Sequence, residues 1–234
     1  MDLKELLTYF NLTRQEAAIY LSLTVNGPMT GYEVAKETGI SRSSVYTNLA
    51  NLVDKGAAYL IEDKAKQYTP AAIDEFCSNK IRELKEIKKQ LIENMPQRQE
   101  EDGGYITIKG RKNILNKIKN MIKQAEKRIY ISSSDDILKT VLPYLEDALA
   151  RELKVVIITQ LPLELNDAVI YQTERKEDQI RLIVDSVEVL TGEIINENNS
   201  TCLYSKKENL VNLFKESLRN EIKLIKLTEG DDLE

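Results

Sequence analysis

Histidine is absent from the 234 residues of this chain. It is the commonest general acid or base in enzymes near neutral pH and the commonest side-chain ligand of metal ions. It is also the nucleophile of enzymes that work through a phosphohistidine. The absence excludes much enzyme chemistry, and we expect no catalytic residue, no bound metal and no cofactor.

Cysteine and long apolar runs are also scarce. The two cysteines, Cys77 and Cys202, lie in segments of different pattern, so neither a disulfide framework nor a Cys-based metal site is indicated. No apolar run approaches the roughly 20 residues that span a bilayer. The segment MDLKELLTYF mixes charges among its leucines, unlike a secretory signal. We therefore expect a cytoplasmic protein.

The composition, with 42% hydrophobic and 30% charged residues, is that of an ordinary soluble globular protein. The net charge of -5 says little about any local patch. Because the pattern changes near residue 100, the sequence predicts two domains. We place a first domain at 1–70, a linking helix at 71–96, a linker at 97–104 and a second domain at 105–234.

The N-terminal third carries the start and stop signals of short helices. A Thr followed three residues later by Glu, the capping box, occurs at Thr13 and again at Thr30. A tight turn at Gly39 follows the second of these helices. Ser41 can then cap a third, SRSSVYTNLANLVDKG, which stops at Gly56. Two helices joined by a tight glycine turn form a helix-turn-helix.

The helix that begins at Ser41 carries polar groups on its first turns, beside an inward stripe of valine and leucine. Arg suits guanine, Asn suits adenine, and hydroxyl groups can bond bases or phosphates. Alternatively, these residues only cap and solubilise the helix, and an aromatic residue at Tyr46 also suits a buried position. The predicted DNA-binding residues of this helix are Ser41, Arg42, Ser43, Ser44, Tyr46, Thr47 and Asn48.

A hairpin is predicted directly after this helix. The segment AAYLIEDKAKQYTP indicates strands at Ala58–Ile61 and Gln67–Thr69, joined by a turn with Lys64 and Lys66. Such a basic wing commonly contacts the DNA backbone, although two lysines on a turn can also be merely solvated. Residues 1–70 hold seven basic and eight acidic side chains. A monomer should therefore bind DNA weakly, and we expect a homodimer.

Three blocks between residues 12 and 76, LTRQEAAIYLSL, ETGISRSSVYTNLANLVDKG and KQYTPAAIDEF, resemble the TrmB family of sugar-responsive transcriptional regulators. The resemblance implies binding of double-stranded DNA through the helix that starts at Ser41, as a dimer on a palindromic operator. Positions that family members use to face DNA correspond here to Arg42, Ser43, Ser44, Tyr46 and Thr47.

A charged helix with an apolar stripe is predicted from Pro70 to Met95. Its period suits a coiled coil, and about 25 residues give roughly 37 Å, close to the 34–36 Å between adjacent DNA half-sites. We predict a dimerisation helix; alternatively, it packs on its own domain. Pro96 ends it before the predicted linker PQRQEEDGG. The stripe consists of Ile73, Phe76, Cys77, Ile81, Leu84, Ile87, Leu91 and Met95.

Beyond Gly104, strands and helices alternate, which predicts an α/β domain with parallel strands. Two strands then flank Asp185-Ser186, and the strand TCLYS follows. We predict a helix at Lys207–Arg219 and a last strand at Ile222–Leu227.

The segment IRLIVDSVEVLTGE resembles the phospholipase D-like sensor domain of TrmB-family regulators. If Asp185 is the Asp of the phospholipase motif, Asp178 and Ile180 occupy its His and Lys positions, so the catalytic pair is missing. The predicted fold class is therefore two-domain, an α+β winged helix followed by an α/β phospholipase D-like domain without catalytic residues.

Ligands of open α/β sheets bind beyond the carboxyl ends of the strands. Hydroxyl and carboxylate groups there suit a sugar or a cation-bearing metabolite. Alternatively, the run SSSDD at residues 132–136 only caps a helix. The predicted ligand-binding residues are Ser132, Ser133, Ser134, Asp135, Thr159, Asp185, Gly192 and Glu193.

These patterns favour a DNA-binding transcriptional regulator whose C-terminal domain senses a small ligand. One alternative is a DNA-binding and dimerisation protein without a ligand. Another is a metal-dependent phosphodiesterase that uses Asp135, Asp136 and Asp185.

Overall fold

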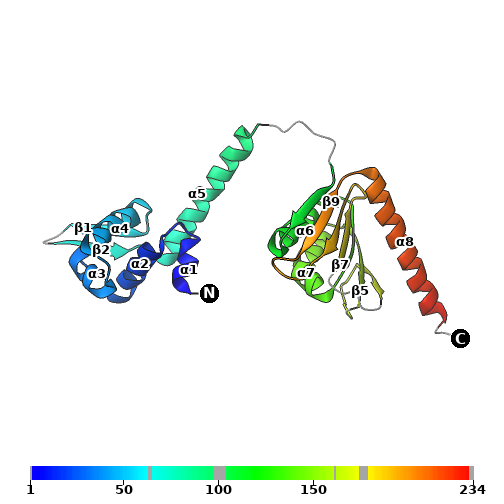
Figure 1. The fold of residues 1–234 in the computed structure, drawn as a ribbon, viewed down its shortest axis with the longest axis horizontal. Helices are drawn as coiled ribbons and strands as arrows, with labels where there is room; N and C mark the ends of the chain where they lie inside the picture. The colour runs from blue at the N-terminus through cyan, green and yellow to red at the C-terminus, as the bar shows by residue number, and fades with distance from the viewer. Residues whose placement is uncertain (1, 63–64, 97–103, 161, 174–178, 232–234) are drawn as a thin grey trace. The chain divides into compact units, whose positions relative to one another are not determined.

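The computed structural model describes residues 2–62, 65–96, 104–160, 162–173 and 179–231, and only the backbone of residues 228–231. The chain divides into two compact units, Met1–Gln97 and Arg98–Glu234. Figure 1 shows a helical unit with a small hairpin and a second unit built on a large sheet. The predicted fold class is confirmed. The predicted linker lies, apart from Gly104, outside the described residues.

The first unit begins with four helices and a two-stranded hairpin. Both predicted capping boxes are present, with Thr13 and Glu16 at α2 and Thr30 and Glu33 at α3. Gly39 takes a left-handed conformation (φ 71°) that ends α3 and turns the chain into α4. The elements are α1 (Leu3–Thr8), α2 (Arg14–Asn26), α3 (Gly31–Thr38), α4 (Arg42–Asp54), β1 (Ala58–Glu62) and β2 (Lys66–Pro70).

Side chains from α2, α3 and α4 meet in one buried core that includes Leu23, Val34 and Leu49. A buried ion pair ties α2 to the end of α4, because Lys55 Nζ lies 2.6 Å from Glu16 Oε2. Burial alone would raise the pKa of the Glu16 carboxyl, but hydrogen bonds from Lys55 and the Thr13 N–H outweigh it and lower that pKa. These contacts tie the end of α4 to the start of α2, while the first turn of α4 stays exposed.

The long helix α5 (Ile73–Asn94) leaves this core after its first turns. Phe76 is buried against Tyr20 and Phe10, with ring centroids 6.2 and 6.3 Å away. The later members of the predicted stripe are exposed, from 42% at Ile87 to 64% at Met95. The single chain therefore leaves the apolar face of α5 open beyond Cys77.

In the described part of the second unit, seven strands form one mixed sheet in the order β3-β9-β8-β7-β4-β5-β6. Only β4, β5 and β6 are parallel neighbours, because hairpin-type connections join β7, β8 and β9. Of the strands in the alternating segment, β4 and β5 are parallel as predicted, whereas β3 pairs antiparallel with β9 and so departs from the prediction. The strands are β3 (Ile106–Lys109), β4 (Arg128–Ser133), β5 (Lys154–Thr159), β6 (Val169–Gln172), β7 (Gln179–Val184), β8 (Glu188–Glu193) and β9 (Thr201–Ser205).

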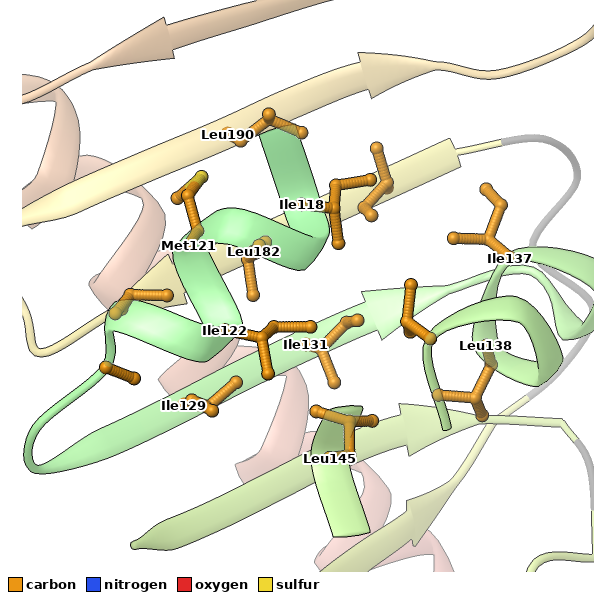
Figure 2. Packing of buried hydrophobic residues seen from close by; sticks show 14 of the residues in the cluster. Ile118, Met121, Ile122, Ile129, Ile131, Ile137, Leu138, Leu145, Leu182 and Leu190 are labelled. Atoms are coloured by element: carbon orange, nitrogen blue, oxygen red, sulfur yellow. The ribbon is translucent and has the colours of Figure 1, made fainter. Parts of the chain in front are cut away.

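Helices cover both faces of the sheet. On one face, α6 (Arg111–Gln124) and α7 (Asp135–Ala150) form the larger core, where Ile118, Ile131 and Leu145 are buried together (Figure 2). On the other face, α8 (Glu208–Asp231) packs on a smaller core that includes Ile183 and Leu218 (Figure 1).

The predicted strand at Ile222–Leu227 is wrong, because these residues belong to α8. The buried residues Val211, Leu218 and Ile225 recur every seven positions, which is a helical and not an alternating pattern. The short edge strand β6 was not predicted.

Candidate DNA interface and ligand site

The first turn of α4 presents hydroxyl groups and a cation to solvent. Ser41 caps the helix, since its Oγ accepts the Ser44 N–H at 3.4 Å and donates to Ser44 Oγ at 2.9 Å. Arg42 and Ser43 beside it are exposed. Backbone N–H groups at a helix N-terminus favour anions, and Arg42 adds a full positive charge. This turn can therefore bind a phosphate or a base edge.

Arg42 is held by a residue of α3 that the sequence analysis did not select. Its Cζ atom lies 4.5 Å from the centre of the Tyr32 ring, a cation–π contact between the two helices. Tyr32 is 53% exposed. Its place two residues after the cap Thr30, on the exposed side of α3, was the available signal.

Tyr46 both packs and remains exposed. A Cβ atom at Gly31 would lie 2.6 Å from Tyr46 Cε1, so the glycine permits the close crossing of α3 and α4. About half of Tyr46 (52%) nevertheless faces solvent, next to exposed Thr47. The two alternatives for Tyr46, packing and surface contact, are therefore compatible.

The exposure expected for Asn48 is wrong. Asn48 is only 9% exposed, and its Nδ2 donates to Gln15 Oε1 at 3.0 Å and to the Ser44 carbonyl at 2.8 Å. It lies between Val45 and Leu49 on the face that α4 turns toward α2. Asn48 therefore joins the two helices and does not face outward.

The hairpin after α4 has the form of the predicted wing. Lys66 is exposed at the start of β2, 3.9 Å from the Glu62 carboxylate on the paired position of β1. A pair this exposed is weak, so Lys66 remains able to bind a phosphate. The predicted contact at Lys64 lies outside the described residues.

In the second unit, polar side chains gather where β4 and β5 end. Ser132, Ser133 and Thr159 are almost completely buried there. Three buried side-chain atoms of the described residues have no hydrogen-bond partner; Glu16 Oε1 is in the first unit, and the other two, Ser133 Oγ and Asp135 Oδ1, are here. Buried polar atoms are rarely left unpaired, because each costs about 1–3 kcal/mol. The cluster therefore has unused hydrogen-bonding capacity.

The alternative that residues 132–136 only cap a helix agrees with the structure in part. Ser134 occupies the N-cap position of α7, but its side chain makes no capping hydrogen bond. Asp135 instead accepts a hydrogen bond from Gln160 Nε2 at 3.0 Å, across the ends of two strands. Asp136 forms an ion pair with Arg111.

Arg181, which was not predicted, lies beside Ser132 at the same end of the strands, but on the face that α8 covers and not on the face of Ser133 and Thr159. It pairs with Glu221 of α8 at 2.7 Å and approaches Ser132 Oγ at 3.4 Å. Burial lowers the pKa of its guanidinium. An arginine inside a strand gives no sequence signal for a site, because its neighbours depend on strand register.

The predicted residues Gly192 and Glu193 lie at the same end of the strands as Ser133. The register aligns Ser133 with Ile180 and Ile180 with Gly192, two strand spacings or about 10 Å away. Gly192 and Glu193 line a hollow of about 350 Å³ together with Arg181. A Cβ atom at Gly192 would lie 2.3 Å from the Thr201 carbonyl oxygen, so the glycine is also required by packing.

The grouping of Asp185 with these residues is wrong. Asp185 follows the end of β7, which runs antiparallel to β4, and so lies at the opposite end of the strands from Ser133. Its carboxylate accepts hydrogen bonds of 2.8–2.9 Å from the N–H groups of residues 126–128. Burial would raise the pKa of Asp185, but these bonds outweigh it and lower that pKa. Asp185 thus holds a turn.

The position of Asp185 argues against the metal-dependent phosphodiesterase alternative, which needs three carboxylates close together. Asp135 and Asp136 start α7, whereas Asp185 lies at the opposite end of the strands. The three carboxylates therefore do not converge. Within the described residues, no group of three His, Cys, Asp or Glu side chains is placed to hold a metal ion. The described helices also include none that is long and apolar enough to cross a membrane.

The first unit, with its helix-turn-helix and wing, defines a winged-helix DNA-binding protein. Residues 7–74 match the family described as sugar-specific transcriptional regulator TrmB, and residues 104–218 match the N-terminal subdomain of the TrmB EBD. The chain belongs to the TrmB family and is a DNA-binding transcriptional regulator.

Individual relatives cover much of the chain. The uncharacterized protein YrhO of Bacillus subtilis is 27% identical over 97% of this chain and 86% of its own length. The HTH-type sugar sensing transcriptional regulator TrmBL1 of Pyrococcus furiosus is 26% identical over 71% of this chain, which spans half of that protein.

Two solved structures are similar at low identity. TrmBL2, an archaeal chromatin protein described with a novel mode of DNA binding, is 21% identical over 94% of this chain and 97% of its own, with a TM-score of 0.45. Nuc from Salmonella typhimurium, a phospholipase D family member, is 16% identical over 50% of this chain and 93% of its own, with a TM-score of 0.39.

Proposed function

We propose that this regulator is a cytoplasmic homodimer whose C-terminal unit binds a small polar ligand, and that the ligand alters DNA binding by the two winged helices. The observation that carries the ligand proposal is the pair of buried, unpartnered atoms Ser133 Oγ and Asp135 Oδ1. A ligand that binds one arrangement of the dimer more tightly than another shifts the equilibrium between them.

The proposed DNA contacts come from the exposed first turns of α4 and from the wing. Arg42, positioned by Tyr32, is the proposed base-reading or phosphate-binding residue at the centre of this surface. Seven basic and eight acidic residues in 1–70 give little overall attraction, so two copies are needed for enough phosphate contacts. The full proposed set is Ser41, Arg42, Ser43, Ser44, Tyr46, Thr47, Lys64 and Lys66.

The exposed stripe of α5 supports the dimer. Apolar side chains that recur every three or four residues and stay exposed are typical of a helix that pairs with a second copy. The stripe continues at its start into an apolar hollow of about 460 Å³ that Leu6, Phe10 and Ile73 line. Pairing two α5 helices would cover Ile81, Leu84, Ile87 and Leu91, which single chains leave in water.

A sugar fits the chemistry of the proposed ligand site. The Ser133 hydroxyl group can donate and accept hydrogen bonds, and the Asp135 carboxylate can accept them, as the hydroxyl groups of a sugar require. The name of the Pyrococcus relative, a sugar sensing regulator, supports the same class. We propose a binding and not a catalytic role for these residues, since the phosphodiesterase carboxylates lie apart.

The ligand proposal is tested by thermal unfolding of the full chain with a panel of neutral sugars. We expect one sugar to raise the melting temperature, and we expect Ser133→Ala and Asp135→Asn to reduce that rise. The matched control is Glu146→Gln, an exposed carboxylate on α7. A rise that both site variants retain would place the ligand elsewhere, and no rise with any sugar would favour the ligand-free alternative.

A further inference from the structure

A second hollow, of about 330 Å³, lies between α8 and the sheet, and we call it the α8 hollow. Its floor is apolar, with Ile183 and Leu218 buried and Tyr130 and Ile222 half-buried. The volume is within the range of roughly 300–1,000 Å³ that is usual for small-molecule pockets.

The rim of the α8 hollow is strongly cationic. Lys215, Arg219 and Lys223 follow one another at intervals of four along α8 and share one helix face, and Lys226 and Arg128 complete the rim. Among the described residues that line the hollow, none is acidic. In the part of the chain whose side chains are described, none of the five forms an ion pair. Like charges gathered in this way repel one another, and an anion would relieve that repulsion.

Acidic residues adjoin the hollow's lining in sequence, and two of them are engaged elsewhere. Glu221 pairs with Arg181, and Asp185 bonds to a turn. Ser186 lines the hollow, and its neighbour Asp185 directs its carboxylate to the backbone N–H groups of residues 126–128. Asp185 therefore satisfies the turn and does not reach across the rim as a counter-charge. The Ser186 hydroxyl adds a hydrogen-bond donor beside the cations.

We propose that the α8 hollow binds a phosphate-bearing small molecule. Lys and Arg side chains are the usual phosphate ligands of proteins, and their number suits a group with more than one negative charge. The rest of the molecule packs on Tyr130, Leu218 and Ile222. This site is separate from the proposed sugar site, since Arg128 begins β4 whereas Ser133 ends it.

The shape of the hollow favours a small molecule over the DNA backbone. Duplex DNA presents its phosphates on a convex surface, which a protein usually meets with projecting side chains or helix ends. A concave site with an apolar floor would leave that floor unused by DNA. A phosphate attached to a compact organic group would contact both the cationic rim and the apolar floor.

Binding would also fasten α8 to the sheet. The cations of the rim come from α8 on one side and from Arg128 of β4 on the other, so one anion joins the two elements. We therefore expect bound anion to slow amide hydrogen exchange in α8 more than in α6.

The test is isothermal titration calorimetry of the full chain with inorganic pyrophosphate and, separately, inorganic phosphate. We expect one site per chain for pyrophosphate, with tighter binding than for phosphate. The double variant Arg219→Gln/Lys223→Gln should weaken binding at least about tenfold. Its matched control, Lys112→Gln/Lys139→Gln, removes two exposed charges from α6 and α7 and should leave affinity unchanged.

Further results separate this proposal from the others. Asp135→Asn should leave pyrophosphate binding intact, because it alters only the sugar site. Absence of pyrophosphate binding, or equal weakening by both double variants, would overturn the proposal. So would a double variant that keeps its pyrophosphate affinity but loses affinity for duplex DNA, since the rim would then belong to the DNA interface.

Discussion

Asp185 shows how one side chain can hold two strands together. Its carboxylate accepts hydrogen bonds from three backbone N–H groups at the start of β4. Its own backbone lies in the left-handed region, with φ 52°. Asn tolerates this conformation, so Asp185→Asn removes charge and acceptor capacity without adding backbone strain. We expect the C-terminal unit to lose about 1–3 kcal/mol of stability in urea unfolding.

The same substitution has a defined pH dependence. The pKa of Asp185 is lowered from its ordinary value of 3.8, so its contribution is present above that value and is lost as the pH falls through the folded-state pKa. The difference between wild type and variant should shrink in acid. Asp167→Asn, at an exposed residue with φ 68°, is the control. Equal stability of Asp185→Asn and wild type at pH 7 would contradict this structural role.

Arg42 is the central residue of the proposed DNA interface. Its guanidinium is held over the Tyr32 ring at the exposed start of α4. Arg42→Ala should weaken binding of the cognate DNA by roughly 1–3 kcal/mol if Arg42 reads a base. Fluorescence anisotropy at fixed salt measures this, with Lys139→Ala on α7 as the control for lost charge. Unchanged affinity would remove Arg42 from the interface.

Single residues also mark where prediction from sequence fails. Ser41 could be predicted as a cap because capping depends on residues three positions apart. Asn48 and Asp185 were misplaced because their partners, Gln15 and residues 126–128, are set by helix packing and strand register. Tyr32 and Arg181 were missed for the same reason: their roles depend on neighbours distant in sequence.

At the level of elements, the apolar stripe of α5 is the proposed dimer interface. Leu84→Glu places a charge in the middle of this exposed stripe and should shift the protein from dimer to monomer at micromolar concentration. Sedimentation equilibrium measures the change, and Lys85→Gln on the neighbouring polar position is the control. A Leu84→Glu variant that remains dimeric would show that α5 does not form the interface.

Most helices and strands could be predicted, because their periods and caps are local. The end of α8 was mistaken for a strand since Ile222–Leu227 is short and rich in isoleucine and leucine. Only the longer repeat from Val211 to Ile225 reveals the helix. Strand order was beyond the sequence, because pairing β7 with β4 depends on contacts across about 50 residues.

For the whole molecule, charge distribution matters more than net charge. The chain carries a net charge of -5, yet a cation stands at the first turn of α4 and five surround the α8 hollow. In the proposed account, an acidic protein of this kind holds DNA through local patches on two copies. Its affinity should therefore fall steeply as salt rises, in proportion to the phosphates contacted.

The most direct test of the account is a titration of the full-length protein against DNA from upstream of its own coding region, with and without each of a panel of sugars. At fixed salt, we predict specific binding by a dimer and a shift in affinity with one sugar, typically 5–150-fold for a coupling of 1–3 kcal/mol. Specific binding that no sugar changes would contradict the sugar-sensing role. Binding no tighter to this DNA than to unrelated DNA would contradict its action at this operator.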